Sequence, residues 1–331
     1  MLLTRKQMAG ISWQLYEHNP VIAPPWLSPV IADPSVLAPE ESPDGIWHLF
    51  AHALPGVFHF RSDDGLSWEK PRLLFRNAMR PFIFRDNGTY VLLYERYRMF
   101  HIYLSMLPMR WRSRIEARTS RDLVSWSRPV TLLSPSLPWH SDPRHGDSVS
   151  NPCLVRAGSG AGSEQADSGA GSEHHLYYSA SLVRVEDCGF NEPLYIGRAR
   201  SASLMGPYVP DPEPLMSPDS RDPWCNLGCG SVKVVPCSDG LAAFRNGIYV
   251  SPEGVSGSAI SLLESVDGVS WKYALPKPVL APSEGWMRSH VYACDFVISG
   301  NEARLYFNAR NDWHWSKGKE KIGVLIGRAG N

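Results

Sequence analysis

Short apolar runs, each followed by a turn that contains Gly or Pro, recur along the whole chain. The first complete set places apolar runs at 33–37, 46–52 and 57–62, and the turn 42–45 separates the first two. A Ser-x-Asp-Gly turn after the third run leads into Ser67-Trp68. Because Asp-Gly between apolar runs is a hairpin signal, the pattern predicts a four-stranded antiparallel unit.

The same unit is repeated, with innermost strands that start near residues 33, 80, 151, 231 and 295. Similar unit ends read Val124-Ser125-Trp126 before Pro129 and Val269-Ser270-Trp271 before Pro278. Self-similarity at a fixed period is typical of closed repeat architectures. We therefore expect an all-β protein that folds as a single five-bladed β-propeller domain over residues 1–331.

The last unit lacks a fourth strand, because the chain ends soon after the apolar run 321–328. The N-terminal segment 11–16 carries the pattern of a fourth strand, with Trp13 followed by Pro20. We expect these two segments to pair and close the ring, which also removes an exposed sheet edge. The alternative is an ordinary β-sandwich in which the similarities between units arise by chance.

One segment is predicted to be a flexible insertion. Residues 158–173 contain Ser-Gly-Ala-Gly-Ser-Glu twice and no apolar residue larger than Ala. Such a composition cannot bury enough surface to offset the entropy lost on ordering. The insertion falls between the first two strands of the third unit, in a hairpin that we expect on the face away from the site.

Composition narrows the class of protein. The formal net charge is zero, which argues against a nucleic-acid partner, since such proteins show a basic excess. No apolar run reaches 18 residues and the first ten residues lack an apolar core, so we expect a cytoplasmic protein without a membrane partner. The sequence shows no second pair of metal ligands to accompany Cys225 and Cys229, so no metal or other cofactor is expected. The oligomeric state stays open.

Alternate loops of a four-stranded unit lie on opposite faces of a propeller. The long, aromatic-rich loops 95–114, 181–193, 246–258 and 308–319 share one face, and the innermost strands begin at that face. Function concentrates in such loops on a rigid scaffold. The residues expected to ring the central cavity are Asp33, Arg80, Asn151, the corner 229–231 and Asp295.

At this point the chain resembles the five-bladed β-propeller glycosidases, especially the family 43 glycoside hydrolases and their relatives. The resemblance rests on Ala32-Asp33-Pro34-Ser35-Val36, on Asn19-Pro20-Val21-Ile22, and on the unit ends at 62–68 and 265–271. It implies an inverting glycoside hydrolase that acts on a carbohydrate partner, with Asp33 as its general base.

The resemblance also exposes gaps in the catalytic set. The family's second Asp position corresponds to Asn151, although Asp147 lies four residues earlier. Its general-acid position falls in the segment 228–231, which has no carboxylate. An inverting glycosidase needs a second carboxyl group at ~6.5–9.5 Å from the base. The pKa of this acid must be raised, whereas the base must stay ionised. The candidates for that further catalytic role are Asp147, Asp295, Glu95 and Glu192, and for Glu95 pairing with an Arg is the alternative.

Several other residues of the same face are expected to bind substrate. Arg favours bidentate binding of carboxylate or phosphate, and aromatic rings offer flat faces to sugars. The expected substrate-binding residues are Arg80, Asn151, His145, His290, Arg310, Trp313 and Trp315. Two alternative functions stay open: a non-catalytic glycan-binding propeller, and a phosphorolytic glycosidase with an Arg-rich phosphate site.

Overall fold

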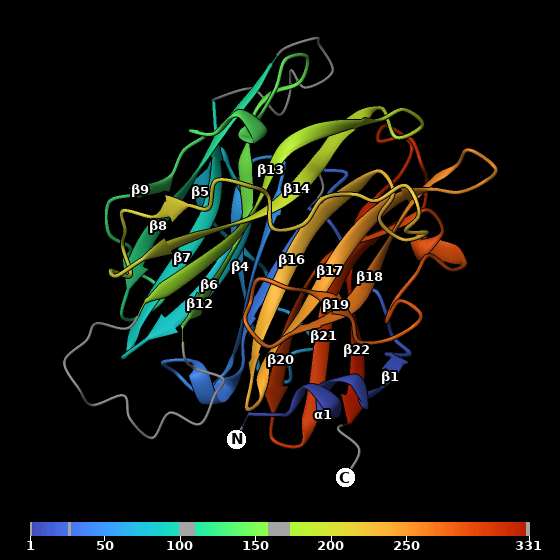
Figure 1. Cartoon of the computed structure of the whole chain (residues 1–331). Coiled ribbons are helices and arrows are strands. Elements are labelled where there is room, and N and C mark those ends of the chain that lie inside the picture. The colour runs from blue at the N-terminus through green and yellow to red at the C-terminus, as the bar shows by residue number, and fades with distance from the viewer. Residues whose placement is uncertain (1, 26–27, 99–109, 158–172, 329–331) are drawn as a thin grey trace.

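The computed structural model describes residues 2–25, 28–98, 110–157 and 173–328, and β-strands dominate it (Figure 1). The first unit contains β2 (Ala32–Leu37), β3 (Trp47–Ala53), β4 (Gly56–Ser62) and β5 (Arg72–Arg76). The second contains β6 (Ala78–Asp86), β7 (Thr89–Tyr97), β8 (Trp111–Ser120) and β9 (Val130–Leu133). The third contains β12 (Val149–Arg156), β13 (His174–Val185), β14 (Phe190–Ser201) and β15 (Val209–Pro210).

The C-terminal part of the chain continues the pattern. The next unit contains β16 (Gly228–Cys237), β17 (Gly240–Val250), β18 (Ser256–Ser265) and β19 (Lys272–Tyr273), followed by β20 (His290–Ser299), β21 (Glu302–Arg310) and β22 (Glu320–Arg328). Strands of one unit pair antiparallel in chain order. The remaining elements are α1 (Arg5–Ala9), β1 (Ser12–Leu15), β10 (Ser141–Asp142), β11 (Gly146–Asp147) and short 3-10 turns at Pro39–Glu41, Pro138–His140 and Gly285–Met287.

The N-terminal strand completes the last unit. β1 pairs antiparallel with β22, from Ser12 opposite Arg328 to Leu15 opposite Leu325. Figure 1 shows the blue start of the chain beside the red end. The predictions of an all-β propeller and of closure by the N-terminal strand are both confirmed. The predicted insertion lies outside the described residues, apart from Glu173.

The Ser-x-Asp unit ends form one recurring turn. Asp64 Oδ1 accepts hydrogen bonds from the backbone N–H of Leu66 and Ser67, both at 2.7 Å. The same turn recurs at Asp122 and Asp267. A short acidic side chain can satisfy local backbone donors in this way, so these residues end one strand and start the next. This explains why the motif repeats so clearly in the sequence.

The hydrophobic core lies between neighbouring units. One cluster joins Val36 and Leu49 of the first unit to Tyr306 and Val324 of the last. Another cluster joins the first unit to the second, through Phe50 and Leu92 among others. Each unit therefore buries both faces of its sheet against its neighbours. No helix among the described residues is long and apolar enough to cross a membrane.

Candidate active site

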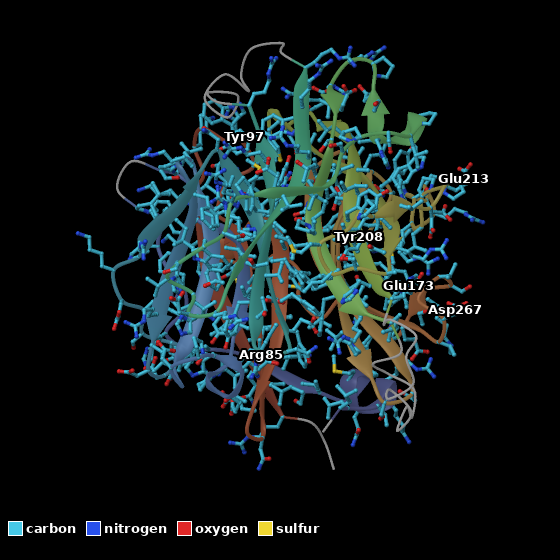
Figure 2. The ribbon with its side chains drawn as sticks, turned by 90° about the vertical axis from the view of Figure 1, so that its left-hand side faces the viewer. Arg85, Tyr97, Glu173, Tyr208, Glu213 and Asp267 are labelled. Atoms are coloured by element: carbon cyan, nitrogen blue, oxygen red, sulfur yellow. The ribbon has the colours of Figure 1, made fainter. Side chains whose placement is uncertain are left out.

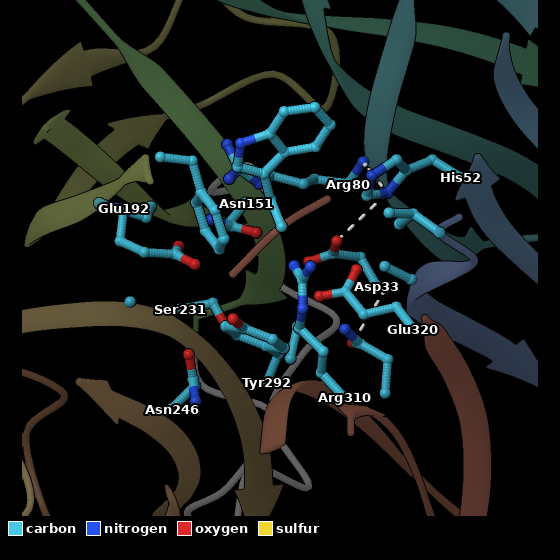
Figure 3. A pocket seen from close by; sticks show the side chains of 18 of the residues that line it. Asp33, His52, Arg80, Asn151, Glu192, Ser231, Asn246, Tyr292, Arg310 and Glu320 are labelled. Carbon is cyan, nitrogen blue, oxygen red and sulfur yellow. Dashed lines mark hydrogen bonds and ion pairs between the residues drawn. The ribbon is translucent and has the colours of Figure 1, made fainter. Parts of the chain in front are cut away.

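A cavity of about 430 Å³ lies where the innermost strands β2, β6, β12, β16 and β20 begin. Phe190 and Trp315 contribute aromatic surface to its wall, beside many polar side chains. Figure 3 shows the polar side chains gathered around one space. They are Asp33, His52, Arg80, Asn151, Glu192, Ser231, Asn246, Tyr292, Asn308, Arg310 and Glu320.

Irregular backbone directs several of these residues into the cavity. The pairing register of each innermost strand shifts near its start, as between Ala32 and Ser35. Asp33, Arg80 and Asn151 have φ values of 52°, 53° and 45°, and each precedes a proline. Positive φ is unfavourable for residues other than Gly, and such strain clusters at functional sites. The bulges thus direct Asp33, Arg80 and Asn151 into the cavity.

Asp33 is held in its ionised form by its neighbours. Its Oδ2 lies 3.2 Å from His52 Nδ1, and its backbone N–H donates to Asn308 Oδ1 at 3.1 Å. Burial acts to raise the pKa of Asp33, but the bond to His52 and the charges of Arg80 and Lys233 outweigh it, so the pKa is lowered below 3.8. Asp33 is therefore a carboxylate at neutral pH.

Glu192 shows the opposite behaviour in the same cavity. It lies near the start of β14, and its carboxyl group has no hydrogen-bond partner among the described residues. Burial raises the pKa of Glu192 to about 8, despite the nearby charge of Arg80. Glu192 is thus largely protonated at neutral pH. The two carboxyl groups hold different protonation states at one pH, as an acid and a base must.

Glu320 is a third carboxyl group of the cavity, and sequence reasoning missed it. It opens β22 opposite Arg310 of β21, and Figure 3 shows both side chains at the cavity. Burial raises the pKa of Glu320, and Arg310 acts against that rise. Arg310 donates to the backbone oxygens of Asp312 and His314, both at 3.0 Å, so its position is fixed.

Tyr292 lines the cavity and has a buried hydroxyl group. Its side chain is only 7% exposed, and its hydroxyl oxygen is buried without a hydrogen bond to any described residue. The ring stacks on His290 with centroids 5.3 Å apart. Burial raises the pKa of Tyr292 well above its usual value, so the hydroxyl stays neutral. A buried hydroxyl of this kind is costly unless a ligand satisfies it.

Half of the residues predicted for the site line the cavity. They are Asp33, Arg80, Asn151, Glu192, Arg310 and Trp315. The other predicted residues do not line it: Glu95, Asp147, Asp295, His145, His290 and Trp313.

Glu95 lies beneath the cavity and anchors Arg80. It accepts hydrogen bonds from Arg80 Nη1 at 2.7 Å and Trp111 Nε1 at 2.9 Å, and it is completely buried. Pairing with Arg, the alternative raised for Glu95, is therefore what the structure shows. Glu95 positions a cavity residue without facing the cavity itself.

Asp295 does not open its strand, because β20 begins at His290 and its bulge falls at residues 292–293. Tyr292 takes the expected place of Asp295 at the cavity. Asp295 instead lines a separate cavity, which also contains Arg85 and Lys233. The last unit lacks the X-Pro pair that marks the bulge in the first three units, so no local signal identifies Tyr292 as the residue at the cavity.

The remaining predicted residues are committed to local contacts. Asp147 lies 3.4 Å from Arg110, and His145 lies 2.9 Å from Asp142. His290 contacts Cys188 Sγ at 3.4 Å and supports Tyr292 from behind. Trp313 donates from its indole nitrogen to the Ser256 backbone oxygen at 2.9 Å.

His52, Asn246 and Asn308 were also missed. They lie near the ends of the second strands β3, β17 and β21, whereas Glu320 begins a third strand. Antiparallel pairing brings these strand ends to the same edge as the start of the innermost strand. Polar residues at the end of an apolar second strand were thus a readable signal.

Two of the four residues in the segment 228–231 are glycines whose positions admit no side chain. Gly230 has a φ of 57°, and a Cβ atom there would lie 2.4 Å from the Asn246 backbone oxygen. Gly228 is equally constrained by the Pro193 backbone oxygen at 2.8 Å. No side chain fits at these positions without displacing backbone. The neighbouring strand β14 supplies Glu192, next to Pro193, on that side of the cavity.

Cys225 and Cys229, on either side of Gly228, lie next to each other. Cys225 and Cys229 are buried, with sulfur atoms 3.5 Å apart. Among the described residues, no group of three or more His, Cys, Asp or Glu side chains is placed to hold a metal ion.

No protein-family model matches the sequence, and no curated protein matches it either. Solved structures of glycan-active enzymes resemble it in fold. A glycosyl hydrolase from Bacteroides ovatus is 15% identical, with 96% of this chain and 94% of that chain covered and a TM-score of 0.62. A β-1,2-mannobiose phosphorylase from Listeria innocua is 12% identical, with coverage of 96% and 97% and a TM-score of 0.61. A thermostable family-43 glycoside hydrolase is 14% identical, with coverage of 94% and 91% and a TM-score of 0.59. At these identities the likeness establishes a shared β-propeller fold.

Proposed function

We propose that this protein cleaves glycosidic bonds, with Asp33 as general base and Glu192 as general acid, in the manner of the family 43 glycoside hydrolases. The observation that carries the proposal is the opposite pKa displacement of two carboxyl groups in one cavity. The proposal agrees with the resemblance of the first innermost strand to that family. It is also supported by the glycan-active enzymes among the structures of similar fold.

The reaction would use one water molecule. The Asp33 carboxylate takes a proton from water, whose oxygen attacks the anomeric carbon while the glycosidic bond breaks. The Glu192 carboxyl group gives its proton to the departing oxygen, so that charge and atoms balance. Because a water molecule attacks directly from the face opposite the leaving group, the anomeric configuration is inverted. The carbohydrate would also meet the side chains of Tyr292 and Trp315, which both line the cavity.

A substrate panel with anomeric analysis tests this function. The protein is incubated with furanosides and pyranosides of several sugars, natural and aryl, with and without inorganic phosphate, and products are followed by proton NMR. We expect a free sugar of inverted configuration, formed at a rate independent of phosphate. If a sugar phosphate is formed, and only when inorganic phosphate is present, the reaction is phosphorolysis and not hydrolysis. Binding of glycans without cleavage of any would instead favour a recognition module.

A further inference from the structure

An arginine-rich surface adjoins the cavity although the chain has no net charge. One hollow of about 540 Å³ and a second of about 440 Å³ share Arg96 as a common wall. Of the residues that line the two hollows, the acidic residue is Asp147 alone. The arginines are Arg72, Arg76, Arg96, Arg98, Arg112, Arg114 and Arg118, and together they are called the arginine surface below.

Strand register places one end of the arginine surface, at Arg96, at the same end of the molecule as the cavity. Arg96 pairs with Ala78, which starts β6 and lies two residues before Arg80. On its other side Arg96 pairs with Arg114 of β8. Figure 2 shows Tyr97, which lines the first hollow, near one end of the sheets and Arg85 near the other. Glu95 accepts from Arg80 in the cavity and from Trp111, the residue before Arg112. Glu95 thus bonds both to a cavity residue and to strand β8, which carries Arg112 and Arg114 of the arginine surface.

Several of these arginines are fixed in place without losing their charge. Arg96 donates to the Arg76 backbone oxygen at 2.6 Å, which leaves its charge uncompensated. Arg118 donates to the Tyr94 hydroxyl and to a backbone oxygen, at 3.1 Å and 3.0 Å. Asp147 is shared by Arg110 and Arg112, at 3.4 Å and 3.6 Å. Guanidinium groups held in this way are preorganised to bind oxyanions in a forked geometry.

We propose that the arginine surface binds the carboxylate or sulfate groups of an acidic glycan, one end of which occupies the cavity. This inference rests on the proposed function and narrows its substrate class. Arg112 pairs with Asp147 and Arg114 with Glu116. The other five guanidinium groups pair with no carboxylate of the described residues, so an acidic chain that leaves the cavity on this side would supply the anionic partner that a neutral glycan lacks. The uncompensated charge also draws an anionic polymer toward the site before contact.

The lining favours a glycan over a nucleic acid. Single-stranded nucleic acids are usually held by exposed aromatic rings that stack on the bases. Here Tyr97 and Phe75 are 3% and 9% exposed, and the Trp126 ring packs edge-on against Phe75 at 5.8 Å. No ring of the arginine surface is free to stack on a base among the residues described. The exposed donors are guanidinium forks, which match carboxylate and sulfate groups.

Binding titrations with defined polymers test the inference. Calorimetry at low salt would compare polygalacturonate, dextran sulfate, unmodified dextran and a single-stranded oligonucleotide. The test variant is Arg98→Gln/Arg112→Gln. The matched control is Arg121→Gln/Arg221→Gln, which removes the same charge at exposed positions outside the arginine surface. Binding needs no turnover, so a failure of the proposed catalytic function would leave this measurement intact.

We expect at least one acidic glycan to bind, and added salt to weaken that binding because screening acts on exposed charges. The test variant should lose affinity by about tenfold or more, and the control by less than about twofold. Unmodified dextran should bind much more weakly than the acidic polymer. Equal losses in the two variants, no binding of either acidic glycan, or tighter binding of the oligonucleotide would each overturn the inference.

Discussion

Two cavities lie along the innermost strands, one lined by Asp33 and Glu192 and the other by Asp295, and they are called the two ends of the central channel below. Their buried carboxyl groups differ in their hydrogen bonds. At one end, Asp295 accepts hydrogen bonds from Ser35 Oγ, from Val36 N–H and from Phe296 N–H, at 2.9, 2.7 and 3.1 Å. At the other end, the Glu192 carboxyl group has no hydrogen-bond partner among the described residues. A buried polar group without internal partners is costly. The difference indicates that one end is built for stability and the other for a ligand.

The Asp295 end links several units of the ring. Ser35 Oγ donates to Asp295 on β20 and accepts from the Ile83 N–H on β6, at 3.0 Å. The first unit is thereby tied to the last and to the second through a single hydroxyl group. Lys233 reaches the same channel, with its ammonium 4.3 Å from the centre of the Phe82 ring. Asp295 is thus hydrogen-bonded within the protein, whereas Asp33 and Glu192 line the cavity.

The largest expected effect comes from Asp33→Asn, which keeps the shape of the side chain but cannot take a proton. Turnover should fall by about 10²–10⁴, the typical contribution of a positioned general base. The matched control is Asp295→Asn, which makes the same change at the other end of the channel. Turnover per folded molecule, with folding monitored by near-ultraviolet circular dichroism, should stay close to that of the unmodified protein in the control. An equal loss of turnover in both folded variants would show that the two carboxylates do not differ in their role in catalysis.

Glu192→Gln should have the next largest effect, on turnover and on its pH dependence. A general acid must be protonated, so activity of the unmodified protein should fall as pH rises through about 8. Asp33 must be ionised, so the acid limb should lie below pH 3.8. In the variant, turnover of alkyl glycosides should fall about a hundredfold and the alkaline limb should disappear. Turnover of aryl glycosides with good leaving groups should fall much less. If the variant keeps the alkaline limb of the pH profile, Glu192 is not the acid.

The same pKa shift has a consequence for stability. The folded-state pKa of Glu192 is raised above 4.5, so protonation favours the folded state at low pH, and that contribution is lost as pH rises toward about 8. Glu192→Gln removes the titration. The melting temperature of the variant minus that of the unmodified protein should therefore increase between pH 5 and about 8. A difference that stays constant over this range would place Glu192 in contact with solvent.

Asp295→Ala should act on stability instead of catalysis. It leaves the Ser35 hydroxyl and the Val36 N–H without their acceptor, at a cost of about 1–3 kcal/mol in the free energy of unfolding. Urea denaturation measures this loss, and Asp295→Asn, which keeps one oxygen acceptor, should lose less. Turnover per folded molecule should be nearly unchanged in both variants. A free energy of unfolding equal to that of the unmodified protein would show that the bonds of Asp295 contribute little.

The contrast between the two ends also shows what the sequence could reveal. The unit repeat, the closing strand and Asp33 at the cavity follow from hydrophobic spacing and from Asp33-Pro34, because both are local signals. Glu320 and His52 reach the cavity through antiparallel register, which brings together residues far apart in the chain. Asp295 and Tyr292 differ by three positions, and only the bulge at 292–293 decides which of them faces the cavity.

The smallest effect is expected from Tyr292→Phe, which removes one buried oxygen atom and leaves the ring in place. The hydroxyl has no partner among the described residues, so its loss should leave the melting temperature unchanged or slightly higher. A substrate that satisfies the hydroxyl would lose one hydrogen bond, worth about 0.5–1.5 kcal/mol, or about two- to tenfold in kcat/KM. Tyr306→Phe is the control, because that hydroxyl already donates to the Gly65 backbone oxygen at 2.8 Å. The control should lose stability and keep kcat/KM. If Tyr292→Phe also loses stability and keeps kcat/KM, the Tyr292 hydroxyl has a partner inside the protein and does not contact the substrate.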